Sequence, residues 1–172
     1  MDHLSIRKID FLAIDSKMAQ TLEAGAAEFT TSLGAQLGTC EDLVREVVRQ
    51  TLAMIAAVPR EVPWGGYLTL DSDRATVVGT CGFKSGPSEN GRVEIAYFTF
   101  PEFEGQGFAT AMAEKLISLA RASPEVQEII AHTLPEPNAS GRILTKVGMQ
   151  WVGEVDDPDD GKLWRWQYRP GP

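Results

Sequence analysis

Residues 92–122 restrict the fold more than any other part of the chain. Arg92–Phe100 (RVEIAYFTF) is rich in β-branched and aromatic residues and predicts a strand. The chain then turns through Gly105 and Gly107 and enters a run in which apolar residues recur every three or four positions, as in an amphipathic helix. A strand that passes through a glycine turn into such a helix is a building unit of sheets covered by helices.

The rest of the chain alternates strands and helices around this unit. Strands are predicted over residues 5–14, 66–71, 75–83, 126–134, 150–155 and 163–168. Helices are predicted over 16–24 after a cap at Asp15, from a capping box at Thr39 and Asp42 to Pro59, and over 138–147. The order predicts an α/β or α+β fold, with a sheet of mixed direction and helices on both faces. With 172 residues and no repeat or linker, residues 1–172 are expected to form a single domain.

Charge and cysteine content exclude several kinds of partner. With 16 Lys and Arg against 24 Asp and Glu, the net charge of −8 has the wrong sign for gripping nucleic acid. No apolar run reaches the roughly 20 residues of a membrane span, and the N-terminus lacks the pattern of a signal peptide. Cys40 and Cys81 stand far apart and without ligand spacing, so we expect free thiols, no metal site and a cytoplasmic location.

The glycine turn is the candidate binding element. Gly105 and Gly107 let backbone approach a ligand, and the N–H groups that open the following helix have no acceptor within the helix. Together they form a seat for a phosphate group. A tight turn without a ligand fits the same pattern. Thr110 stands where the dinucleotide fingerprint needs a third glycine, and the Gly-Lys-Ser/Thr of a phosphate loop is absent.

A second segment, further along the chain, indicates which ligand the turn could bind. Residues 95–112 (IAYFTFPEFEGQGFATAM) and 136–149 (EPNASGRILTKVGM) together resemble the GNAT superfamily of N-acetyltransferases. The resemblance is closest to the branch that acetylates protein N-termini, ribosomal proteins and small amines. It implies a mixed, mostly antiparallel central sheet with helices on both faces and a splayed pair of parallel strands. Acetyl-CoA, as co-substrate, would lie in that gap.

The resemblance also implies which residues hold acetyl-CoA. Its diphosphate would bind to the turn and helix start, formed by Gly105, Gln106, Gly107, Phe108, Ala109 and Thr110. Its pantetheine arm would pair with the strand end Phe98-Thr99-Phe100, opposite the strand at 130–134, and bind Asn138. A backbone N–H near Phe98 or Thr99 would hold the thioester oxygen. Glu104 departs from the basic or neutral residue usual in this loop and could weaken coenzyme binding.

Two residues are the candidates for proton transfer. Glu94 is the candidate general base, since related enzymes use a Glu on this strand. An ion-paired Glu of the sheet is the alternative, and His132 is the second candidate for the base. Many family members use a Tyr of the last helix as acid, and residues 143–146 contain none. Ser140 matches the Ser that the related branch uses. Asn138 and Ser140 could equally be plain helix caps.

We therefore expect an acetyl-CoA-dependent N-acetyltransferase that acts by direct attack in a ternary complex. The charge of −8 favours a small cationic amine or a protein N-terminus as acceptor. The acceptor pocket is expected between the two N-terminal helices and the loop at 84–91. The alternatives are a non-catalytic acyl-CoA-binding or sensing domain and a partner-binding module built on the hairpin of Trp151, Trp164 and Trp166. A homodimer stays open.

Overall fold

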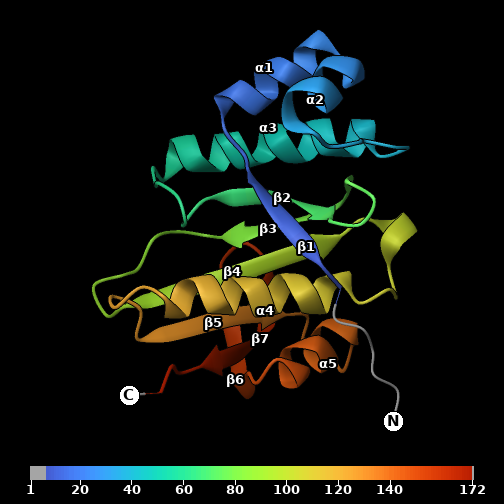
Figure 1. Cartoon of the computed structure of the whole chain (residues 1–172). Coiled ribbons are helices and arrows are strands. Elements are labelled where there is room, and N and C mark those ends of the chain that lie inside the picture. Colours follow the sequence, from blue (N-terminus) through green and yellow to red (C-terminus); the bar gives the residue numbers. More distant parts are fainter. Residues whose placement is uncertain (1–6, 172) are drawn as a thin grey trace.

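The computed structural model describes residues 7–171 and contains one seven-stranded sheet (Figure 1). The strands are β1 (Ile9–Ala13), β2 (Gly66–Asp71), β3 (Thr76–Phe83), β4 (Arg92–Thr99), β5 (Glu128–Thr133), β6 (Gln150–Asp157) and β7 (Gly161–Tyr168). Their spatial order is β1-β2-β3-β4-β5-β7-β6. Strands β4 and β5 run parallel, and every other neighbouring pair is antiparallel. The mixed, mostly antiparallel sheet is confirmed. Residues 5 and 6 of the first predicted strand lie outside the described part.

Five α-helices and one short 3₁₀ helix surround the sheet. They are α1 (Ser16–Ala24), α2 (Ala26–Leu33), α3 (Glu41–Ala57), η1 (Pro101–Phe103), α4 (Phe108–Arg121) and α5 (Ala139–Lys146). The sequence did not predict α2 or η1. Gly25 ends α1 and also starts α2, so the chain turns between two helices within one residue. None of the helices within residues 7–171 is both long and apolar enough to cross a bilayer.

The two N-terminal caps have different outcomes. Asp15 caps α1 as predicted, because its carboxylate accepts the N–H of Met18 at 2.8 Å. The prediction of a capping box at Thr39 and Asp42 was wrong. Helix α3 begins after Cys40 without a side-chain cap, and the Thr39 hydroxyl donates instead to Glu102, which is 63 residues away in the sequence. The Thr39 hydroxyl therefore forms a tertiary hydrogen bond in place of the helix cap that the local sequence predicted.

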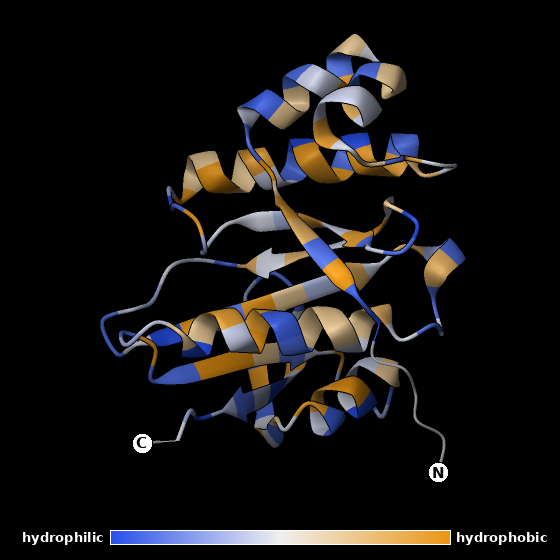
Figure 2. Ribbon diagram, in the orientation of Figure 1, coloured by the Kyte–Doolittle hydropathy of each residue, from blue (hydrophilic) through white to orange (hydrophobic). Residues whose placement is uncertain are grey.

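Helices cover both faces of the sheet, and glycines set how closely the layers approach. On one face, a Cβ at Gly79 would lie 3.2 Å from the side chain of Met112 in α4. On the other, a Cβ at Gly82 would lie 2.5 Å from the carbonyl oxygen of Gly65. Successive strand residues point to opposite faces, so 79 and 82 report on the two sides. Figure 2 shows the hydrophobic colouring along α4 and the strands that it crosses.

Candidate active site

Strands β4 and β5 separate partway along their length. Their pairing covers Arg92↔Glu128, Val93↔Ile129 and Glu94↔Ile130 and no further residue in the described chain. Beyond Glu94, β4 remains paired with β3, while β5 remains paired with β7. The splayed parallel pair implied by the family resemblance is therefore present.

The backbone of β4 presents free hydrogen-bonding groups to this gap. Lys84 donates its N–H to the carbonyl of Glu94, and Phe100 donates to the carbonyl of Val78. Even-numbered residues of β4 thus turn their backbone groups toward β3, and alternation turns those of Tyr97 and Thr99 toward the gap. Of the three strand residues predicted to bind the pantetheine arm, Phe98, Thr99 and Phe100, only Thr99 has its N–H directed there. Phe98 and Phe100 direct theirs at β3, because adjacent residues of a strand point their amides in opposite directions.

The glycine turn has the conformation that the binding hypothesis needs. Gly105 and Gly107 have φ values of +73° and +89°, which residues with a Cβ rarely adopt. Gly107 is the N-cap of α4 and offers no side chain. Within residues 7–171, no hydrogen bond uses the backbone N–H groups of 105–110. The turn therefore leaves its donors available.

An N-terminal arginine supports the turn from outside. Arg7 donates through Nε to the carbonyl oxygen of Gln106 at 2.8 Å, and its guanidinium carbon lies 5.2 Å from the centre of the Phe108 ring. This cation lies next to the loop in which Glu104 is the unusual acid. The sequence contained no signal for the contact, because 99 residues separate its two partners.

A cavity of about 590 Å³ opens on these amides. Its lining comes from β4, the glycine turn and the N-terminal ends of α4 and α5: Tyr97, Phe98, Thr99, Phe103, Glu104, Gly105, Gly107, Phe108, Ala109, Thr110, Ala139, Ser140 and Ile143. Ser140 is thus brought to the same cavity as the turn. Asn138 does not line it; its side chain accepts the N–H of Gly141 at 2.9 Å and caps α5.

Two buried hydroxyls in this cavity have no partner. The oxygen atoms of Tyr97 Oη and Thr99 Oγ1 are shielded from solvent, and no described residue forms a hydrogen bond with either. A buried hydroxyl without a partner is costly, so these two atoms favour a polar ligand between β4 and α5. The free amides, the glycine cradle and the orphaned hydroxyls all fit the diphosphate and pantetheine groups of acetyl-CoA.

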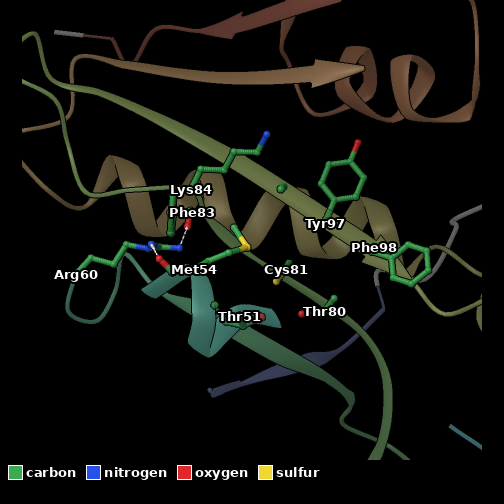
Figure 3. Close-up of a pocket in the computed structure, with 12 residues that line it drawn as sticks. Thr51, Met54, Arg60, Thr80, Cys81, Phe83, Lys84, Tyr97 and Phe98 are labelled. Atoms are coloured by element: carbon green, nitrogen blue, oxygen red, sulfur yellow. Dashed lines mark hydrogen bonds between the residues drawn. The ribbon is translucent and has the colours of Figure 1, made fainter. Parts of the chain in front are cut away.

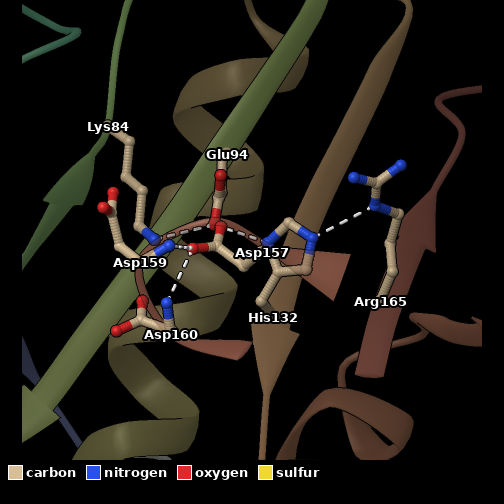
Figure 4. Close-up of polar contacts among 7 residues, drawn as sticks. All are labelled: Lys84, Glu94, His132, Asp157, Asp159, Asp160 and Arg165. Atoms are coloured by element: carbon tan, nitrogen blue, oxygen red, sulfur yellow. Dashed lines mark hydrogen bonds and ion pairs between the residues drawn. The ribbon is translucent and has the colours of Figure 1, made fainter. Parts of the chain in front are cut away.

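The candidate base Glu94 belongs to a chain of four polar side chains (Figure 4). Its Oε1 atom lies 2.7 Å from His132 Nδ1 and 3.0 Å from Lys84 Nζ. Arg165 donates through Nε to His132 Nε2 at 3.1 Å. Because arginine can only donate, Nε2 must be the acceptor, and the proton of a neutral His132 lies on Nδ1 and points at Glu94. Both ring nitrogens of His132 are therefore occupied.

The turn between β6 and β7 places further acidic side chains near these four polar residues (Figure 4). The N–H groups of Asp160 and Asp159 bond to the carboxylate of Asp157 at 2.9 and 2.8 Å. These two hydrogen bonds lower the pKa of Asp157, with a smaller contribution from the positive charge of Lys84. Residues 7–171 contain no group of three or more His, Cys, Asp or Glu side chains that could hold a metal ion.

A second cavity, of about 190 Å³, lies on the α3 side of the gap (Figure 3). Its lining is Thr51, Met54, Arg60, Gly66, Thr80, Cys81, Gly82, Phe83, Lys84, Ala96, Tyr97 and Phe98. Helix α3 contributes to this lining and α1 does not, and Lys84 is the one lining residue from the loop at 84–91. The larger part of this lining comes from the strands, whose cross-strand neighbours a linear sequence does not display.

The two cavities share Tyr97 and Phe98. A third, smaller space of about 100 Å³ between β4 and β5 is lined by Glu94, His132, Ser140 and again Tyr97. Burial raises the pKa of Tyr97 to about 12, against a smaller lowering by the neighbouring hydroxyl of Ser140. The sequence analysis placed Tyr97 on a face of the strand and gave it no role. Strand alternation alone does not show that one residue lines three cavities.

Comparisons with known proteins agree with this geometry. The chain matches the family described as acetyltransferase (GNAT) domain over residues 19–150. The uncharacterized N-acetyltransferase p20 of Bacillus licheniformis is 31% identical over 114 residues, which are 66% of this chain and 64% of that protein. The matched stretch is therefore less than two thirds of that relative's length.

Solved structures share the fold at low identity. RimL, a ribosomal L7/L12 α-N-protein acetyltransferase in complex with coenzyme A, has a TM-score of 0.64 at 14% identity and covers 96% of both chains. The microcin C7 self-immunity acetyltransferase MccE, in complex with acetyl-CoA and AMP, has a TM-score of 0.65 at 13% identity, over 96% of this chain and 94% of that one. The family match covers well over half of the 172 residues, and the chain therefore belongs to the GNAT family of acetyltransferases, whose members use acetyl-CoA.

Proposed function

We propose that the chain transfers the acetyl group of acetyl-CoA to a primary amine by direct attack in a ternary complex. The observation that carries the proposal is a pair of neighbouring cavities that share two lining residues of β4. The cavity of about 590 Å³, here called the coenzyme cavity, opens on the free amides of 105–110. The cavity of about 190 Å³ on the α3 side, here called the acceptor cavity, shares Tyr97 and Phe98 with it. Two reactants can therefore meet without a covalent enzyme intermediate.

Acetyl-CoA supplies a thioester. In the balanced step, the amine nitrogen bonds to the acetyl carbon, the carbon–sulfur bond breaks, and the sulfur leaves with the electron pair of that bond. The amine must lose a proton, and the thiolate must gain one from solvent or from a donor in the site. The N–H of Thr99, which points into the gap, is the donor best directed at a carbonyl oxygen there.

Glu94 is the proposed base. Both its contacts, Lys84 and His132, go to Oε1, and no described residue bonds to Oε2. One oxygen of the carboxylate is therefore available to a water or an amine. His132 would first have to give up its bond from Arg165 or its contact with Glu94. We propose that His132 orients Glu94, and that Ser140 lies at the leaving-group end of the coenzyme cavity.

The acceptor cavity argues against a polyamine or an aminoglycoside. Its described lining contains two cations, Arg60 and Lys84, and no carboxylate. Met54 and Phe98 give it an apolar wall and are 49% and 45% exposed. We propose an acceptor with one amine on a largely apolar body, such as a protein N-terminus or a small monoamine. The net charge of −8 describes the whole chain and not the charge inside this cavity.

A non-catalytic acyl-CoA-binding domain is the second candidate. Its support is Glu104, which lines the coenzyme cavity and would repel a phosphate. Arg7 supplies an opposing charge beside the same loop. Acetyl transfer to any amine would exclude this candidate.

Three broader expectations remain proposals. A single domain over residues 1–172 is supported by the one continuous sheet. A cytoplasmic location is supported by Cys40 and Cys81, which are free and buried. A homodimer is supported by Trp151 and Val152 on the edge strand β6, which are 53% and 49% exposed.

Calorimetry with acetyl-CoA tests the proposed site. Gly105→Ala would place a methyl group at the turn and strain its positive φ, so we expect affinity to fall about tenfold or more. Gly34→Ala is the matched control: Gly34 also has a positive φ and open space around it, but lies at the end of α2. It should lose similar stability and keep its affinity. Equal affinities for all three proteins would contradict the site.

A free-thiol assay with a panel of amines then tests transfer. Peptide N-termini and apolar monoamines should release coenzyme A faster than spermidine or an aminoglycoside. Binding of acetyl-CoA without release by any amine would favour the non-catalytic alternative.

A further inference from the structure

One residue of the glycine turn faces away from the coenzyme cavity. Every residue from Phe103 to Thr110 lines this cavity except Gln106. The carbonyl oxygen of Gln106 lies on the outside of the turn, where it accepts a hydrogen bond from Nε of Arg7 at 2.8 Å. Among residues 7–171, this is the only hydrogen bond of the peptide group that joins Gln106 to Gly107.

The orientation of this peptide group decides where its N–H points. The group is trans, and the C=O and N–H of a trans peptide point in opposite directions. Because the Gln106 oxygen is turned outward to Arg7, the N–H of Gly107 is turned inward, and Gly107 lines the cavity. No described residue accepts a hydrogen bond from that N–H. The contact with Arg7 therefore leaves a directed donor for a ligand.

Local structure does not fix this orientation by itself. Gly107 has a φ of +89°, and glycine adopts φ values of either sign, so rotating the peptide group by half a turn meets little steric resistance. Helix α4 does not prevent the rotation, because the bond that ties Gly107 to the helix uses its carbonyl, which accepts the N–H of Ala111 at 3.2 Å. A rotated peptide would direct the Gln106 oxygen at an anionic ligand and repel it. The bond from Arg7 opposes that rotation.

Arg7 also brings a charge that no described carboxylate neutralises. Its stem passes Gly107, where an added Cβ would lie 3.5 Å from Arg7 Cγ, and its guanidinium carbon lies 5.2 Å from the centre of the Phe108 ring. None of the ion pairs within residues 7–171 includes Arg7. Because a guanidinium stays protonated, the turn has a permanent cation behind it, while Glu104 places an acid in its lining.

We propose that Arg7 is a positioning residue of the coenzyme site: it holds the peptide between Gln106 and Gly107 with the N–H directed at the diphosphate of acetyl-CoA, and its charge offsets that of Glu104. Arg7 acts through the turn and does not itself line the cavity. A charged donor on the carbonyl also polarises the peptide group, which makes the N–H on its other side a stronger donor. The proposal rests on the proposed function, because it takes acetyl-CoA as the ligand.

Calorimetry with acetyl-CoA tests the proposal first. Arg7→Met keeps an apolar stem against Gly107 and Phe108 but removes the donor and the charge, so we expect affinity to fall about tenfold or more. Arg7→Lys keeps a charge and a donor and should stay within about threefold of wild type. Arg121→Met is the matched control, since the Arg121 guanidinium also lies over an aromatic ring, 5.7 Å from the centre of Tyr168, but at the far end of α4. Its affinity should match wild type.

A second acetyl donor separates positioning of the diphosphate from general damage to the fold. S-acetylpantetheine carries the same thioester without a diphosphate. Arg7→Met should raise KM for acetyl-CoA about tenfold with little change in kcat, whereas its kcat/KM for S-acetylpantetheine should match wild type. In ¹⁵N-labelled wild-type protein, coenzyme A should shift the amide resonance of Gly107, because that N–H gains an acceptor.

Three results would overturn the proposal while leaving acetyl transfer in place. They are wild-type affinity in Arg7→Met, an equal loss of kcat/KM toward both acetyl donors, and a Gly107 resonance that coenzyme A does not move. The last is measured on wild type and does not depend on the folding of a variant. Failure of wild type to bind coenzyme A at all would overturn the proposed function as well.

Discussion

At the scale of single residues, the position of the proton on the His132 ring determines how this ring contacts the candidate base, Glu94. Arg165 has no lone pair to offer, so its contact with His132 Nε2 determines the tautomer of the ring and leaves Nδ1 as donor to Glu94. The side chains of Glu94 and His132 are 19% and 12% exposed, so the contact is partly sheltered from water. This geometry supports our proposal that His132 orients Glu94 and does not itself act as the base.

Glu94→Gln is expected to reduce kcat about 10²- to 10⁴-fold, because an amide cannot accept the amine's proton. Acetyl-CoA affinity should change little, since Glu94 does not line the coenzyme cavity. Glu128→Gln is the matched control, because Glu128 is also an ion-paired carboxylate of the sheet, with Arg92 as its partner. Its kcat should match wild type. Calorimetry with steady-state rates decides the matter, and a lost affinity in Glu94→Gln would assign that residue to coenzyme binding instead.

At the scale of elements, the short helix α5 separates two possible uses of its first residues. Its two sides line different cavities, with Ser140 and Ile143 on the coenzyme cavity and Asn138 and Arg142 on another of about 450 Å³ beside Trp164. The helix has only eight residues, so its cap contributes a large share of its local stability. Asn138 therefore serves the helix directly.

Asn138→Ser keeps a capping oxygen and removes the amide donor. We expect its stability to match wild type and its acetyl-CoA affinity to stay within about threefold, because Asn138 lies outside the coenzyme cavity. Asn138→Ala should lose about 1 kcal/mol of unfolding free energy. Urea denaturation and calorimetry measure the two quantities separately. An affinity at least tenfold weaker in Asn138→Ser would restore the pantetheine contact implied by the family resemblance.

At the scale of the whole molecule, alkaline stability depends on a thiol in the core. Burial raises the pKa of Cys81 from 9.0 to about 12, outweighing the lowering by Thr69 and Lys115. Between these values the unfolded chain loses the proton and the folded chain keeps it. The unfolded state therefore gains, and unfolding free energy falls as pH rises above 9.

Cys81→Ala removes this dependence. Relative to the difference at pH 7, the variant should gain about 1.4 kcal/mol on wild type by pH 10. Urea denaturation of both proteins at pH 7, 9 and 10 gives the comparison, and Cys40 is present in both as an internal reference. Parallel curves for wild type and variant across this range would show that the thiol ionises normally in the folded protein.

Most of the fold could be read from the chain itself. Helix α1 with its Asp15 cap, the hairpin strands β2 and β3 and the unit of β4 and α4 follow from spacing, caps and turns, which are local properties. The free amides of the glycine turn also follow locally, since the first N–H groups of any helix lack acceptors within it. The resemblance over residues 95–112 and 136–149 supplied the family.

Tertiary structure decided which side chains meet. Several contacts join residues that are far apart in the sequence. Arg7 contacts the glycine turn, Thr39 donates to Glu102, and Arg165 donates to His132. Tyr97 of β4 and Ser140 of α5 line the same cavity. Such contacts depend on strand order, register and the splay of β4 from β5. Periodicity says which face a residue takes within its own element but carries no information about what the fold places opposite it.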